Sequence, residues 1–252
     1  MSKPDTPVLK ITDIPTAVGL LTRLPVRADT TRMSASAWAF PMVGVIVGTL
    51  AAIIGLLLMK TGLSAGLCAA VVLAVMIIIT GAMHEDGLAD TVDGLWGGWD
   101  KERRLEIMKD SHIGTYGVLA LLLSVILRWT AIAGLISTGG LLVGVIIAAT
   151  LSRAPMVVLM AVIPHARDGG LSASVGRVTQ TPAAIAVGFA VLTAVVFCGW
   201  SGLLSVAAVA LSGLICALIA QRKIGGQTGD ILGATQQISE IVVLLTMAVI
   251  WV

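Results

Sequence analysis

The segment from Gly81 to Gly94 holds the most concentrated chemistry in this sequence, because Asp86, Asp90 and Asp93 recur there at spacings of four and three residues. On an α-helix these spacings place all three carboxylates on one face. Like charges so close together repel each other unless a partner neutralises them. Carboxylate oxygens favour Mg²⁺ or Mn²⁺ over zinc, and Mg²⁺ often combines a few carboxylates with substrate phosphate oxygens. The pattern therefore predicts a divalent cation and phosphate chemistry.

A second acidic pair, Glu106 and Asp110, lies four residues apart and can also share one helical face. Gly94, Gly97 and Gly98 separate the two groups and permit the tight reversal that would bring the two helices together. The predicted metal ligands are Asp86, Asp90, Asp93, Glu106 and Asp110. The alternative is a solvated loop in which these acids pair with neighbouring Arg and Lys residues.

Polar residues near the acids could bind the rest of a substrate. Arg103, Arg104 and Lys109 suit phosphate oxygens, although positive charge beside a membrane explains them equally well. His84 has no second histidine at ligand spacing, so we expect it to contact substrate and not metal. The glycine-rich segment 223–240 would let backbone amides approach an anion. Its predicted substrate contacts are Gly226, Thr228 and Asp230.

The elements that must position these residues follow from the composition. Of 252 residues, 57% are hydrophobic and only 12% are charged, whereas soluble domains carry about 25% charged residues. The sequence therefore predicts an all-α integral membrane protein. A helix needs about 20 apolar residues to cross a bilayer, and seven stretches qualify or come close. They are residues 38–59, 63–83, 116–136, 141–163, 182–199, 203–220 and 238–252.

The connections between these stretches alternate in length. The long polar loops are residues 84–115, 164–181 and 221–237, so all of them fall on one side of the membrane. Together with the N-terminal segment 1–37, that side carries 13 of the 16 Lys and Arg residues, which marks it as cytoplasmic. Arg128 and Arg153 fall inside spans and should face the bundle interior or a polar cavity. Arg153 is also a predicted substrate contact, and the equally good alternative is that its side chain extends toward the membrane surface.

The remaining sequence features concern the N-terminal segment, the number of domains and the alternative functions. An apolar stripe in residues 11–24 predicts a helix that either lies flat at the membrane interface or packs against the loops. No repeat is evident, and the chain is interpreted as one domain, 1–252. A net charge of +2 without a clustered basic face excludes nucleic-acid binding. A cation-coupled transporter is an alternative, although the acids crowd at one end of the bundle instead of its midplane.

Several motifs resemble the cobalamin (5′-phosphate) synthase family, also called adenosylcobinamide-GDP ribazoletransferases. They are segments 84–94, 104–110 and 226–234, and segments 21–25 and 40–44 are similar to the family's opening. The resemblance implies a Mg²⁺-dependent transferase that joins α-ribazole or its 5′-phosphate to adenosylcobinamide-GDP and releases GMP. It also implies an inner-membrane protein of bacteria or archaea. An oligomer is compatible with the sequence.

A more distant resemblance is to the CDP-alcohol phosphotransferases. Asp90 and Asp93, followed by Gly94, match the first part of that family's pattern. Glu106 and Asp110 stand where its later aspartates would fall, but the first is Glu, the intervening stretch is shorter and an expected Ala-Arg is absent. By this analogy Asp110 should take the proton from the ribazole hydroxyl, with Asp93 as the second catalytic residue. A phospholipid synthase using a CDP-activated donor is the nearest alternative.

Overall fold

Helices account for most of the chain, as the composition predicted. A computed structural model describes residues 9–251. The helices are α1 (Asp13–Leu21), α2 (Phe40–Met59), α3 (Ala65–Thr80), α4 (Met83–Gly97), α5 (Lys101–Ile107), α6 (Thr115–Ser137), α7 (Leu141–Leu151), α8 (Ala154–Val162), α9 (Leu171–Val175), α10 (Gln180–Cys198), α11 (Gly202–Ile224) and α12 (Gly229–Ile250). Short 3₁₀ helices occupy Thr30–Arg32 (η1), Ala35–Ala39 (η2) and Gly199–Ser201 (η3). No strand forms within residues 9–251, which confirms the all-α class.

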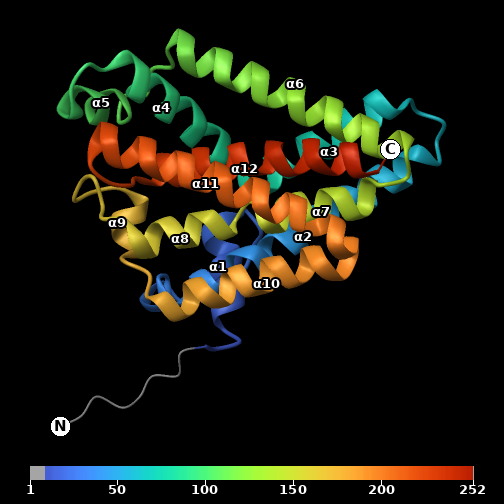
Figure 1. Cartoon of the computed structure of the whole chain (residues 1–252), viewed down its shortest axis with the longest axis horizontal. Coiled ribbons are helices and arrows are strands. Elements are labelled where there is room, and N and C mark those ends of the chain that lie inside the picture. Colours follow the sequence, from blue (N-terminus) through green and yellow to red (C-terminus); the bar gives the residue numbers. More distant parts are fainter. Residues whose placement is uncertain (1–8, 252) are drawn as a thin grey trace.

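Within residues 9–251, five helical segments are long and apolar enough to cross a membrane, or six if α3 and α4 together count as one bent span. One of the five, Gln180–Ile224, has 45 residues, more than twice the roughly 20 that a span needs. It comprises α10 and α11, which lie side by side and run in opposite directions (Figure 1). If α10 and α11 are counted as two spans, and α3 with α4 as one bent span, the described residues contain seven candidate spans, the number predicted.

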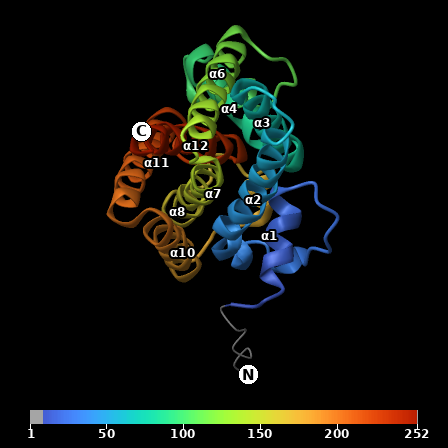
Figure 2. The same cartoon turned by 90° about the vertical axis from the view of Figure 1, so that its right-hand side faces the viewer.

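The long connections gather at one end of the bundle. In Figure 1, α5, α9 and the connection from α11 to α12 lie at the left, while the short connections and the C-terminus lie at the right. The alternation of loop lengths in the sequence therefore predicted this arrangement correctly. Figure 2 shows α12 in the middle of the bundle, bordered by α4, α6, α7 and α11.

Two predicted spans have different bounds in the structure. The second was expected to reach residue 83, but α3 ends at Thr80 and α4 leaves it at an angle of 86°. Gly81 and Ala82 both adopt left-handed backbone angles, with φ of +65° and +58°, and such a conformation ends a helix. The last span was expected from residue 238, but α12 begins at Gly229, capped by the Thr228 side chain. Val252 lies outside the described residues.

The N-terminal helix α1 packs against other helices of the protein. α1 contacts η2 and α2, and its residue Asp13 is fully buried. Burial raises the pKa of Asp13, but hydrogen bonds from Arg32 at 2.7 Å and from Trp38 at 3.0 Å outweigh burial and hold that pKa below its usual value. Ile11 of the predicted apolar stripe is 86% exposed, whereas Val18 and Leu21 are buried. Residues 1–8 of the predicted N-terminal segment lie outside the described residues.

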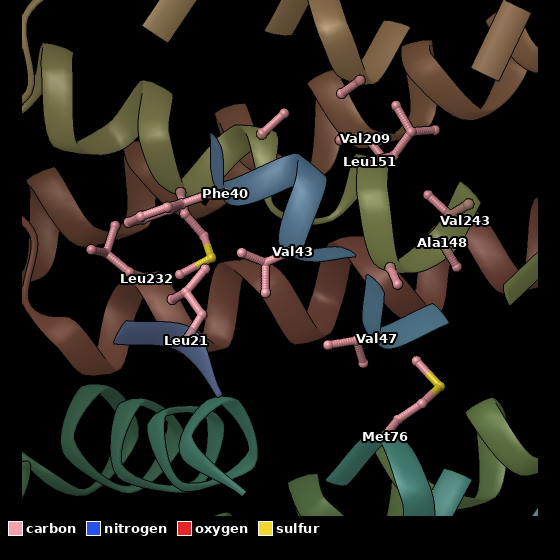
Figure 3. Packing of buried hydrophobic residues seen from close by; sticks show 14 of the residues in the cluster. Leu21, Phe40, Val43, Val47, Met76, Ala148, Leu151, Val209, Leu232 and Val243 are labelled. Carbon is pink, nitrogen blue, oxygen red and sulfur yellow. The ribbon is translucent and has the colours of Figure 1, made fainter. Parts of the chain in front are cut away.

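Small residues let the central helices approach closely. An added β-carbon on Gly48 of α2 would lie 2.8 Å from the Ile146 Cα of α7, and one on Gly44 would collide with the Ala149 backbone. Such glycine contacts replace the hydrophobic driving force that is missing within a bilayer. Figure 3 shows Val43 and Val47 of α2 among the buried side chains of this core.

Candidate active site

The acidic helix α4 packs closely against the start of α12. A β-carbon on Gly87 of α4 would lie 2.9 Å from the Asp230 carbonyl oxygen and 3.1 Å from the Gly233 Cα of α12. The two glycines therefore allow the helix backbones to touch. As a result Asp230, which is remote in sequence, joins the carboxylates of α4, and Asp86, Asp93 and Asp230 all lie close enough to Asp90 to repel its charge.

A polar cavity of about 530 Å³ lies beside α4. Asp86 and Asp90 contribute one wall, and Lys109, Asp110 and His112 from the connection between α5 and α6 contribute another. The carboxylates of Asp86 and Asp90 accept no hydrogen bond and form no ion pair with any residue in the range 9–251. Two carboxyl groups one helical turn apart thus face this cavity without a direct ion pair among the described residues.

The five predicted metal ligands are not brought together. Asp93 accepts hydrogen bonds from the backbone amides of Gly114 at 2.7 Å and Gly117 at 2.8 Å, so it caps the start of α6. Glu106 is exposed and pairs with Arg103 at 2.7 Å. Met108 packs onto Gly94 and is buried, which turns the Glu106 face of α5 outward. Among the described residues, no three His, Cys, Asp or Glu side chains are grouped closely enough to hold a metal ion.

The pair Asp86 and Asp90 nevertheless fits Mg²⁺. This ion commonly takes one or two carboxylates from the protein and completes its octahedron with water and substrate phosphate oxygens. A third acid, Asp110, lines the same cavity. The donor set is therefore reduced from the predicted five to two carboxylates on α4, with Asp110 across the cavity.

Asp110 forms a pair with His112, which the sequence analysis overlooked. The Nδ1 atom of His112 lies 2.6 Å from Asp110 Oδ1, and the backbone amide of His112 donates to the same oxygen at 3.2 Å. These hydrogen bonds lower the pKa of Asp110, and the Asp110 carboxylate in turn raises the pKa of His112. Both side chains are exposed and line the polar cavity. A histidine two residues after a candidate acid is a signal that the sequence did contain.

The basic residues predicted to bind phosphate have different roles. Arg104 donates to the carbonyls of Gly98 at 3.0 Å, Trp99 at 3.1 Å and Lys223 at 3.0 Å, so it fastens the turn after α4 to the end of α11. Three of its five N–H donors are therefore occupied, and phosphate binding by Arg104 stays a prediction. Arg103 is paired with Glu106, whereas Lys109 lines the polar cavity.

The glycine-rich connection before α12 pairs with protein backbone at Gln227. Gln227 N donates to the Pro164 carbonyl at 2.8 Å, and Ala166 N donates to the Gln227 carbonyl at 2.9 Å. A side chain at Gly226 would collide with that Pro164 carbonyl. Thr228 Oγ1 accepts from the Ile231 amide at 3.2 Å. Gly226 and Thr228 therefore shape the connection, and an anion contact at its remaining backbone amides stays a prediction.

Asp230 remains in a position to meet a ligand. It pairs with Arg167 at 3.0 Å, a residue that the sequence analysis did not single out. Both line a second cavity of about 200 Å³, whose other polar residues are His84, Asp86 and Ser172. Its apolar residues come from α1, α2, α4, α8, α9 and α12, and are Leu20, Leu21, Phe40, Met83, Met156, Met160, Leu171, Val175 and Leu232. We call it the amphipathic cavity.

A cluster of buried charges lies deeper in the bundle. Arg128 of α6 donates to Glu85 at 2.9 Å and to Glu240 at 3.1 Å, and Gln236 donates to Glu240 at 2.7 Å. Arg153 is also buried and donates to the Ala149 carbonyl at 2.6 Å. The prediction that Arg128 and Arg153 face the interior is confirmed. Arg153, however, lies among these buried residues and not in the polar cavity.

Replacing Asp93 tests its capping role. We expect Asp93→Asn to lower the free energy of unfolding by about 1–2 kcal/mol, because the amide can accept only one of the two backbone hydrogen bonds. That change corresponds to a fall in melting temperature of roughly 2–8 °C for a chain of this size. Thermal unfolding in detergent measures it, with Glu106→Gln as an exposed control. Unchanged stability would mean that the cap is dispensable.

Comparisons with known proteins agree on one protein family. The family model for cobalamin-5-phosphate synthase matches residues 13–248. An adenosylcobinamide-GDP ribazoletransferase of Bradyrhizobium diazoefficiens is 44% identical over 244 residues, covering 94% of each chain. Proteins of the same name are 42% identical in Sinorhizobium medicae, covering 94% of this chain and 95% of the relative, and 39% identical in Chlorobium phaeovibrioides, covering 88% and 90%. No solved structure matches this chain.

Proposed function

This chain belongs to the cobalamin-5-phosphate synthase family, and from that premise we propose how its cavities carry out the reaction. The enzyme joins ribazole to adenosylcobinamide-GDP in cobalamin synthesis. A ribazole hydroxyl oxygen forms a bond to the phosphorus on the cobinamide side of the pyrophosphate. The bond from that phosphorus to the bridging oxygen breaks, and GMP leaves with the electron pair. The hydroxyl proton must pass to a base.

We propose that the pyrophosphate binds in the polar cavity. Asp86 and Asp90 would hold Mg²⁺ there, and the single observation that carries this assignment is that both carboxylates face the cavity without a partner. When bound, the ion supplies neutralisation of the phosphate charges and of the charge that develops on GMP. Lys109, on the opposite wall, adds a positive charge for the phosphate oxygens. Positioning and electrostatics of this kind provide most of the acceleration in phosphoryl transfer.

The proton acceptor is proposed to be Asp110. It lines the same cavity as Asp86 and Asp90 and is exposed to solvent, so a proton that it receives can leave. His112, hydrogen-bonded to Asp110 at 2.6 Å, can orient the carboxylate.

The cavity is proposed to open toward the cytoplasm of a bacterial or archaeal inner membrane. The long connections at this end of the bundle carry eight of the 16 Lys and Arg residues, and such residues favour the cytoplasmic side. Both nucleotide substrates would then be available from the compartment in which nucleotides are made.

The decisive experiment combines purified protein, adenosylcobinamide-GDP and α-ribazole, and follows GMP by chromatography. We expect GMP release to require both substrates, to stop in excess EDTA, and to return with Mg²⁺ or Mn²⁺ but not with Zn²⁺. Thermal unfolding in EDTA is the control that the chain stays folded. Undiminished release in EDTA would exclude the cation while leaving the transferase intact. Release of CMP from a CDP-activated alcohol, without GMP release, would instead support the phospholipid synthase alternative.

A further inference from the structure

The two cavities beside α4 meet at a single acidic residue. Asp86 lines both the polar cavity and the amphipathic cavity, which differ in size and chemistry. The polar cavity contains Lys109, Asp110 and His112, whereas most residues of the amphipathic cavity are apolar. A reaction between two substrates needs two binding volumes that share the reacting position, and this arrangement provides them.

The two substrates differ in the same way as the two cavities. The donor carries a pyrophosphate, which needs cations and polar groups. The acceptor is a nucleoside whose base, a dimethylated benzimidazole, is flat, uncharged and largely apolar. Burying such a ring against apolar side chains is favourable, whereas burying a pyrophosphate there would not be. We infer that the amphipathic cavity is the binding site for the ribazole base, with the ribose directed toward Asp86. This inference rests on the proposed function.

The walls of this cavity suit an aromatic ring. Figure 3 shows Phe40, Leu21 and Leu232 approaching one another from three different helices. Met156 and Met160 line the cavity from α8, and methionine adapts its shape to aromatic surfaces and contacts them favourably through sulfur. All five of these side chains are buried in the core of the protein.

Unpartnered polar atoms indicate where the polar part of the nucleoside would lie. His84 is 1% exposed, and its Nε2 atom has no hydrogen-bond partner among the described residues. Arg167 likewise has two buried nitrogen atoms, Nε and Nη1, without a partner. Buried polar atoms are normally satisfied. Hydroxyl groups of a ribose, or the 5′-phosphate of the phosphorylated form beside Arg167, would supply the missing partners.

The guanine of the donor fits this cavity less well, because its polar edge needs several hydrogen bonds. Ser172 already donates to Gln227 at 2.6 Å, and Asp230 is already paired with Arg167 at 3.0 Å. Two groups that could read a guanine edge are therefore engaged, and most of the remaining wall is apolar, which suits a methylated ring better.

A pair of substitutions on α8 tests the inference. Met160→Trp would fill the amphipathic cavity, whereas Val158→Trp, on the same helix, points into a separate apolar cavity of about 320 Å³ between α8, α10 and α11. We expect Met160→Trp to raise the KM for α-ribazole at least about tenfold, with the KM for adenosylcobinamide-GDP changed less than about twofold. Val158→Trp should leave both values unchanged.

Further measurements keep the test decisive if the larger side chain prevents folding. Met160→Ala enlarges the cavity and should reduce the preference for the dimethylated over the unsubstituted benzimidazole riboside about tenfold. α-Ribazole should also bind the wild-type protein without donor or Mg²⁺ in calorimetry. A change confined to the KM of the GDP donor, or an unchanged base preference in Met160→Ala, would overturn the inference. Absence of GMP release by the wild-type protein would instead refute the proposed reaction.

Discussion

Asp90→Asn is expected to reduce GMP release by about 10³-fold or more while the protein becomes no less stable. The loss follows because a bound metal contributes several kcal/mol to charge stabilisation in the transition state, and each 1.36 kcal/mol is a factor of ten in rate. The stability follows because Asp90 forms no hydrogen bond or ion pair in the described chain, and Asp86, Asp93 and Asp230 repel its charge. Removing that charge relieves the repulsion.

Steady-state GMP release and thermal unfolding in detergent measure the two effects on the same preparation. Glu106→Gln is the matched control, since Glu106 is exposed and its partner is Arg103. Its turnover should stay within about twofold of wild type, because exposed ion pairs contribute little. Full turnover by Asp90→Asn would rule out the metal assignment. Strong loss in Glu106→Gln would restore the five-ligand arrangement predicted from the sequence.

Local patterns in the sequence were sufficient to predict much of the fold. Long apolar runs predicted the membrane helices, and the alternation of short and long connections predicted that the polar loops share one end. The spacing of Asp86, Asp90 and Asp93 predicted one helix, and α4 contains all three. These properties depend on residues within one or two turns of each other, so periodicity and composition can report them.

The contacts between remote helices could not be derived in that way. Gly87 and Gly233 are separated by most of the chain, yet they set the packing of α4 on α12 and bring Asp230 to the acidic helix. In the sequence, Gly233 belongs to the glycine-rich segment 223–240, which was expected to approach an anion. Asp93 shares a helical face with Asp90, but the amides at the start of α6 engage it. Which partner a carboxylate finds depends on tertiary packing, and spacing alone does not contain that information.

Part of the buried charge cluster could have been predicted from the sequence, because it contains a charged residue within an apolar span. A lone arginine in an apolar span requires a counter-charge inside the bundle, but the sequence was used only to predict that Arg128 faces the interior or a polar cavity. The structure supplies Glu85 from α4 and Glu240 from α12. Glu85 also lines the polar cavity, next to Asp86. Arg128 therefore fastens the acidic helix to α6 and α12 and fixes the direction in which Asp86 and Asp90 point.

Arg128→Met is consequently expected to be the most destabilising of the substitutions considered. It leaves Glu85 and Glu240 buried without their cation, and breaking a buried ion pair from one side costs about 3–5 kcal/mol. Thermal and denaturant unfolding in detergent measure the loss, and Arg222→Met, at an exposed position on α11, should change stability by less than about 0.5 kcal/mol.

Combining Arg128→Met with Glu85→Gln and Glu240→Gln should recover part of the loss, because neutral amides tolerate burial better than unpaired carboxylates. If the recovered protein folds but releases GMP slowly, the cluster positions the acidic helix in addition to stabilising it. Wild-type stability in Arg128→Met alone would show that the two glutamates do not depend on this arginine for neutralisation.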